Sequence, residues 1–171
     1  MKDDMAGAAA VCGALFLASD MELDANVTAI CPLTDNKTGS GAINPGDILK
    51  MYNGVTVEII STDAEGRLIL ADALAYGIEK YKPDYIIDIA TLTGACSIAL
   101  GRHATGLLST DEKLSKAIKE AGDDTYERVW ELPMFDEYKE QIKSDVADIK
   151  NTGGRHAGTI TAAQFLSYFT E

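Results

Sequence analysis

The stretch STDAEGRL, residues 61–68, decides the fold, because two carboxylates and a guanidinium fall close together at a change of pattern. An apolar run at residues 55–60 precedes it, and a run with helical periodicity at residues 68–81 follows it. The charges therefore mark the end of a strand and the start of a helix, which is the usual position of a site in an α/β protein. We predict an α/β fold with three α/β/α layers around a central mixed, largely parallel sheet.

The spacing of the charged residues in this stretch suggests a chemistry. In an extended chain, residues two apart point to the same side, so Asp63 and Glu65 are able to aim at one point. Converging carboxylates repel each other unless a cation lies between them, and a hard divalent metal ion is the natural candidate. Arg67 is two residues further on and is placed to hold an anion or a developing negative charge. The alternative is that Thr62 or Asp63 caps the following helix, with Glu65 and Arg67 in its solvated first turn.

Length and composition limit the class of protein. The 171 residues are enough for one domain with a real core, and the net charge of -12 argues against a general binder of nucleic acid or of anionic membranes. No run reaches the ~20 apolar residues that span a bilayer. The three cysteines, Cys12, Cys31 and Cys96, are widely spaced and lie in apolar segments, so we expect buried, reduced thiols of a cytosolic protein.

Several local patterns predict secondary structure near the charged stretch. Asn53-Gly54 separates two strand-like runs and predicts a hairpin with a type I′ turn. The apolar runs at residues 26–31 and 85–90 predict buried strands, the second interrupted by Asp88, which should then need a buried partner. Asp72 lies in the middle of the predicted helix and is expected to be a structural hydrogen-bonding partner rather than a ligand.

Longer motifs of the sequence are more specific than these patterns. TDAEGRL at residues 62–68, followed by ADAL at residues 71–74, resembles the signature of the cytosolic leucyl aminopeptidase family, whose members are two-metal hexameric peptidases. MKDDMAGAA at residues 1–9 and ATLTGA at residues 90–95 also resemble segments of that family, as does the loop at residues 144–155. The resemblance therefore runs along the whole chain.

The resemblance implies roles for particular residues. It makes Asp4, Asp63 and Glu65 metal ligands, with Glu65 bridging two ions, and makes Arg67 a catalytic residue that acts through a bound bicarbonate. It also implies that the substrate contacts four residues: Met1, Thr91, Leu92 and Gly94.

The function that the resemblance implies is that of a metal-dependent aminopeptidase of the cytoplasm. It would hydrolyse leucine and other apolar residues from the N-terminus of peptides, with a water activated by two Mn²⁺ or Zn²⁺ ions. A homohexamer is implied in the full-length form. The family's segment of the type K-G-x-x-x-D, which supplies further ligands, does not occur in this sequence. We therefore expect residues 1–171 to be a single catalytic domain, incomplete at both ends and without the family's N-terminal domain, and to be inactive alone.

Two other classes of function stay open at this point. The chain could be a non-catalytic scaffold of the same fold, or a nucleic-acid-binding module, although the acidic charge argues against the second. A magnesium phosphohydrolase is a weaker reading, because no glycine-rich phosphate loop is present.

Overall fold

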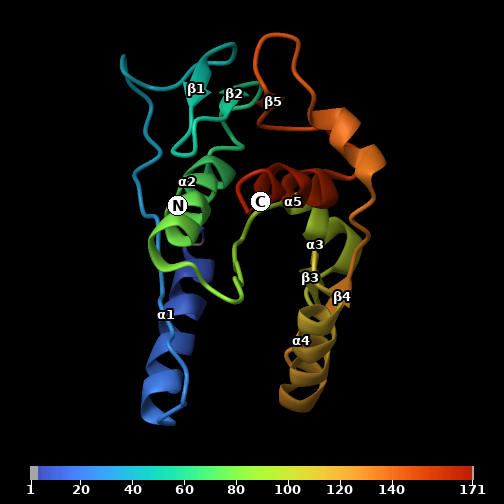
Figure 1. Ribbon diagram of the computed structural model, residues 1–171. Helices are drawn as coiled ribbons and strands as arrows, with labels where there is room; N and C mark the ends of the chain where they lie inside the picture. The colour runs from blue at the N-terminus through green and yellow to red at the C-terminus, as the bar shows by residue number, and fades with distance from the viewer. Residues whose placement is uncertain (1–3, 171) are drawn as a thin grey trace.

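The computed structural model describes residues 4–170 and confirms the α/β class. Helices dominate, and the strands are short (Figure 1). In chain order, the elements are α1 (Ala6–Asp20), β1 (Ile48–Lys50), β2 (Thr56–Glu58), α2 (Gly66–Tyr81), α3 (Gly94–Leu100), β3 (Thr105–Leu107), α4 (Glu112–Thr125), β4 (Val129–Glu131), the 3-10 helix η1 (Asp136–Ile142), β5 (Ile149–Lys150) and α5 (Gly158–Ser167).

The strands form two small sheets in the part of the chain that is described. The first has the order β1-β2-β5, with β1 antiparallel and β5 parallel to the central strand β2. The second pairs β3 with β4 in parallel. The strands are thus mixed and partly parallel, as predicted, but they are divided between two sheets rather than gathered into one.

The hairpin predicted at Asn53-Gly54 is formed, but its turn is of another type. Ile48 pairs with Glu58 and Lys50 with Thr56 across β1 and β2. Gly54 has a φ of 93°, whereas Asn53 is not among the residues with positive φ, so the predicted type I′ turn, which needs positive φ at both, is wrong. The backbone N–H of Gly54 donates to the carbonyl of Met51 at 2.9 Å, which closes a turn that ends in a glycine with positive φ.

The two buried strands predicted at residues 26–31 and 85–90 are not formed. Neither run belongs to a strand of the described chain, and large apolar side chains in both are exposed, including Val27, Tyr85 and Ile87. The run at residues 26–31 follows α1 and passes beside it, because Cys31 lies against Cys12 of that helix (Figure 1). An apolar run forms a strand only if a partner strand supplies its ladder, and the described residues supply none here.

The hydrophobic core lies between the first sheet, α2, α5 and η1. The side chains that share this cluster are Met51, Val57, Ile59, Leu68, Ala71, Ile142, Ile149, Phe165, Leu166 and Phe169. Phe165 and Phe169 pack with their rings 5.3 Å apart. This cluster fixes the start of α2 against β2 and β5, and so positions the charged stretch between β2 and α2.

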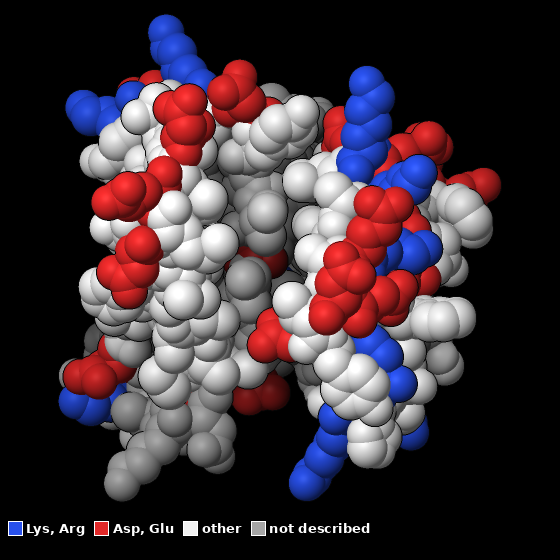
Figure 2. Space-filling view, turned by 90° about the horizontal axis from the view of Figure 1, so that it is seen from below, with Lys and Arg blue, Asp and Glu red and all other residues white. Residues whose placement is uncertain are grey.

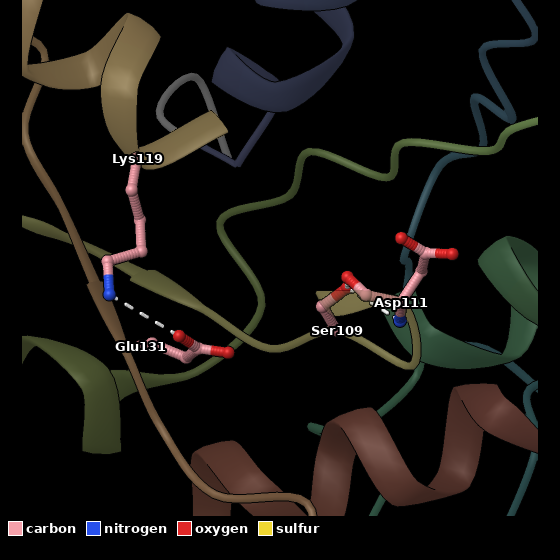
Figure 3. A network of polar contacts seen from close by, with 4 residues as sticks. All are labelled: Ser109, Asp111, Lys119 and Glu131. Atoms are coloured by element: carbon pink, nitrogen blue, oxygen red, sulfur yellow. Dashed lines mark hydrogen bonds and ion pairs between the residues drawn. The ribbon is translucent and has the colours of Figure 1, made fainter. Parts of the chain in front are cut away.

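The second sheet is covered by α4, which begins at an N-cap, Asp111, whose side chain accepts a hydrogen bond from the backbone N–H of Leu114 at 2.7 Å. Lys119 of α4 reaches Glu131 of β4 at 3.5 Å (Figure 3). Both side chains are well exposed, so this ion pair contributes little to stability.

Among residues 4–170, no helix combines the length and the apolar character needed to cross a bilayer.

Candidate functional site

A cavity of about 690 Å³ lies between α1, α2 and the two unpaired apolar segments. Its lining includes every predicted site residue that the structure describes: Asp4, Asp63, Glu65, Arg67, Thr91, Leu92 and Gly94. Met1, the remaining one, lies outside the described residues. Segments far apart in the sequence therefore bring polar side chains to one space. Seen from below, the molecule is hollowed between two parts that both carry acidic side chains (Figure 2).

The loop that carries Asp63 and Glu65 is held by one buried side chain, that of Asn151. Its Oδ1 accepts hydrogen bonds from the backbone N–H groups of Ile60 at 2.9 Å and Ser61 at 3.3 Å. Its Nδ2 donates to the carbonyls of Ser61 at 2.6 Å and Ala64 at 3.3 Å. Since Asn151 follows β5, which pairs with β2, the sheet register brings this amide to the end of β2.

Glu65 and Arg67 lie at the start of α2, and both have buried polar atoms without a partner. Glu65 Oε2 and Arg67 Nε are buried and make no hydrogen bond within residues 4–170. Arg67 is only 7% exposed, and its Nη1 donates to the backbone carbonyl of Asn151 at 2.9 Å. Burial lowers the pKa of the Arg67 guanidinium, and the negative charge of Glu65 opposes that shift. An unpaired buried carboxylate oxygen and an unpaired buried donor are costly unless a ligand satisfies them.

Asp4 and Thr91 meet at another part of the cavity. The Thr91 hydroxyl donates to Asp4 Oδ1 at 2.7 Å, which joins the start of α1 to the end of the apolar segment at residues 85–90. Gly7, one turn further along α1, makes this approach possible, because a Cβ at Gly7 would lie 2.1 Å from the carbonyl oxygen of Ile89.

The helix-capping alternative for the charged stretch is wrong. The N-cap of α2 is Glu65, and no side chain there accepts a capping hydrogen bond. Arg67 is buried rather than solvated. Asp4 likewise does not cap α1, whose N-cap is Met5, and instead accepts from Thr91. Asp63 and Arg67 therefore do not have the capping and solvated first-turn roles that this alternative gave them.

Asp63, Glu65 and Asp4 share the cavity but do not form a tight cluster. Within the described residues, no group of three or more His, Cys, Asp or Glu side chains lies close enough together to hold one metal ion. The donor set still suits a hard divalent cation, since it consists of carboxylates and includes the unpartnered Glu65 Oε2. The residues present thus fit part of a coordination shell.

Two residues of the site were not predicted from the sequence to belong to it. Asn151 lies in a loop noted only for its resemblance, and its hold on the Asp63 loop depends on the pairing of β2 with β5, which a two-residue strand does not reveal. Asp88 lines the cavity with an exposed side chain, so the buried position that would have required a partner is not found. Partial desolvation raises the pKa of its carboxyl group. Asp72 is a structural partner as predicted, because its Oδ1 accepts from the backbone N–H of Tyr52 at 2.8 Å.

Comparison with known proteins places the chain in a family. A family model described as "Cytosol aminopeptidase family, catalytic domain" matches residues 1–171. The sequence is 57% identical over 171 residues to a "Probable cytosol aminopeptidase" of Chlorobaculum tepidum, covering 100% of this chain and 34% of that protein. It is 56% identical over 169 residues to the protein of the same name from Geobacter sulfurreducens, covering 99% of this chain and 34% of the relative.

A solved structure agrees with these matches. A mutant leucine aminopeptidase from tomato superimposes with a TM-score of 0.92 at 41% identity, over 100% of this chain and 34% of that one. The chain thus spans about a third of the length of the relatives it matches. The motifs at residues 62–68 and 90–95, the cavity they share and these matches together show that the chain belongs to the cytosol aminopeptidase family, in its catalytic domain.

Proposed function

We propose that this chain is part of a metal-dependent aminopeptidase that hydrolyses leucine and other apolar residues from the N-terminus of peptides. The observation that carries the proposal is the cavity at the start of α2, where Glu65 Oε2 and Arg67 Nε are buried without partners beside Asp63. Membership of the cytosol aminopeptidase family supports the reaction type. The name of the tomato relative, a leucine aminopeptidase, supports the preference for leucine.

Asp4, Asp63 and Glu65 are the proposed ligands of two divalent metal ions, Mn²⁺ or Zn²⁺. Such a pair of ions, when bound, lowers the pKa of water toward neutrality and so supplies the nucleophile for peptide hydrolysis. Asn151 keeps Asp63 and Glu65 in place through the backbone of their loop. The Thr91 hydroxyl holds the Asp4 carboxylate through one oxygen, which leaves its other oxygen available.

Arg67 is the proposed catalytic residue, because its Nε donor is buried and unpartnered while its Nη1 is fixed by Asn151. A guanidinium fixed in this way is able to hold bicarbonate or to stabilise negative charge that develops on the peptide carbonyl oxygen. Its burial strengthens both interactions, since the local dielectric constant is lower than in water.

Thr91, Leu92 and Gly94 are proposed to contact the substrate, because they line the same cavity at the end of the segment at residues 85–90. The cavity wall also carries apolar side chains, among them Ile69 and Leu70 of α2. Such a wall favours an apolar N-terminal side chain.

The organisation of the whole protein is also part of the proposal. Residues 1–171 are taken as a single catalytic domain, incomplete by itself, in a cytoplasmic homohexamer. Two observations support an incomplete domain. The described residues hold no cluster of three ligating side chains, and the chain covers 34% of the length of the Chlorobaculum tepidum relative. The 171 residues alone are then expected to be inactive.

The test is a chimera in which these 171 residues replace the matching residues of the Chlorobaculum tepidum relative, assayed with a leucyl-amide substrate and Mn²⁺. We expect the chimera to turn over the substrate, and Arg67→Met to lower kcat by about 10²-fold or more. Arg102→Met is the matched control, because Arg102 is exposed and outside the cavity. An inactive chimera beside an active relative would favour a non-catalytic scaffold, and full activity of Arg67→Met would remove Arg67 from the mechanism.

A further inference from the structure

Two of the three thiols of the chain lie against each other, although they are far apart in the sequence. Cys12 Sγ of α1 is 3.7 Å from Cys31 Sγ, which lies at the end of the apolar run at residues 26–31. The sequence predicted buried, reduced thiols, and the predicted burial is wrong, because Cys12 is exposed and Cys31 and Cys96 are half-buried. Cys96 lies elsewhere, against Gly106 of β3.

We propose that Cys12 and Cys31 form a reversible disulfide that ties the segment at residues 26–31 to α1. The bond needs only a small movement, since the two sulfurs would approach from 3.7 Å to ~2.05 Å. The backbone is free to make that movement, because between residues 26 and 38 no backbone–backbone hydrogen bond is found in the described structure. Within residues 4–170, this segment belongs to no strand ladder, so none of those ladders would have to break.

The two thiols differ in a way that sets the order of the reaction. Cys12 is exposed and open to an oxidant, whereas Cys31 is half-buried and its Sγ is 3.9 Å from the carbonyl oxygen of Ala8. Burial raises the pKa of the Cys31 thiol, and the hydrogen bond and the charge of Cys12 raise it further. Cys12 is therefore the first nucleophile and Cys31 the resolving thiol.

The oxidant we name is a small-molecule disulfide, and the steps balance with it. The Cys12 thiolate attacks one sulfur of that disulfide, forms a mixed disulfide and releases one thiolate. Cys31 then loses its proton and attacks Cys12 Sγ, which forms the protein disulfide and releases the second thiolate. The two cysteines give up two protons and two electrons, and the oxidant leaves as two thiols.

The position of the pair connects this bond to the cavity. Cys31 itself lines the cavity, as do Ala8 and Val11 of the same face of α1, and the helix begins just after Asp4. A covalent link would fix the unpaired apolar segment against the helix and so hold one wall of the cavity. This consequence does not depend on the aminopeptidase proposal.

The test uses the 171-residue chain carrying Cys96→Ser, which leaves only the pair, incubated with oxidised glutathione. We expect a monomer that is lighter by about 2 Da, the mass of two hydrogens, and that returns to its original mass with a dithiol reductant. Cleavage with a glutamate-specific protease after the exposed Glu22, which lies between the two cysteines, should then give two peptides that separate only after reduction.

The single variants Cys12→Ser and Cys31→Ser, each with Cys96→Ser, are the matched controls. Each should accumulate glutathione adducts instead of the lighter species, with the adduct forming faster on Cys12 than on Cys31. A stable glutathione adduct on the chain with both cysteines, or disulfide-linked dimers as its main product, would overturn the proposal. So would a chain that stays fully reduced.

Discussion

At the scale of single residues, Asn151 carries the largest share of the site's geometry. Its side chain is fully buried and bonds four backbone groups of the loop that bears Asp63 and Glu65. Removing it leaves buried N–H and C=O groups without partners, each of which costs about 1–3 kcal/mol. The loop would then lose the geometry that brings its carboxylates to the cavity.

We therefore predict that Asn151→Ala lowers the free energy of unfolding by about 2–4 kcal/mol, measured by urea denaturation followed by circular dichroism. Asn26→Ala is the control at an exposed asparagine, and it should change the free energy of unfolding by less than about 0.5 kcal/mol. Equal effects of the two substitutions would show that the Asn151 bonds do not hold the loop.

Asp88 gives a prediction about pH. Desolvation raises the pKa of its carboxyl group above 3.8, so the folded chain binds this proton more tightly than the unfolded chain does. Its contribution to stability is full below pH 3.8 and is lost as the pH rises through the raised folded-state pKa. Asp88→Asn should therefore stabilise the chain at neutral pH and remove this loss. Urea denaturation midpoints of both proteins, measured between pH 3.5 and 7, test this prediction. A lower midpoint for Asp88→Asn than for the original chain at pH 7 would contradict it.

Asp148 is the internal contrast, because hydrogen bonds from the Thr56 hydroxyl and the Thr56 backbone N–H lower the pKa of its carboxyl group. Its contribution is present above pH 3.8 and is lost as the pH falls through the lowered folded-state pKa. Asp148→Asn should thus remove stability at neutral pH, which is the opposite sign to Asp88→Asn.

At the scale of elements, the contact of α1 with the segment at residues 85–90 depends on one glycine. A Cβ at Gly7 would lie 2.1 Å from the Ile89 carbonyl oxygen and 2.8 Å from Ala90 Cα, both backbone atoms. We predict that Gly7→Ala pushes the helix and the segment apart and destabilises the chain by about 1–3 kcal/mol.

The same helix contains the control. A Cβ at Gly13 would meet no atom within 4 Å, so Gly13→Ala should stabilise the chain by about 0.5–1 kcal/mol through helix propensity alone. Urea denaturation of the two variants decides the matter. If both substitutions stabilise the chain, the close approach of α1 to residues 85–90 is not present in solution.

Local patterns predicted one helix and one hairpin correctly, whereas they did not predict which strands pair. The periodic run at residues 68–81 became α2, and Asn53-Gly54 became a hairpin, because both depend on neighbours in sequence. The partner of β2 is β5, which has two residues and so carries no alternating pattern. The apolar runs at residues 26–31 and 85–90 have strand composition, but composition does not supply a partner.

At the scale of the whole molecule, the candidate site is an assembly of distant segments. The start of α1, the start of α2 and the end of the apolar segment at residues 85–90 meet at one cavity. The spacing of Asp63, Glu65 and Arg67 predicted that their side chains would share a site, because they are neighbours in sequence. The contact of Asp4 with Thr91 and the hydrogen bonds from Asn151 could not be predicted, because they join residues far apart in the sequence.

The central claim is that Glu65 of this cavity belongs to a metal site that the chain completes only in part. The direct measurement is calorimetry of Mn²⁺ and Zn²⁺ binding to the 171-residue chain, to Glu65→Gln and to Asp124→Asn, the control at an exposed carboxylate outside the cavity. We predict weak binding that Glu65→Gln weakens by about tenfold or more and that Asp124→Asn leaves unchanged. Equal affinities for all three proteins would contradict the account.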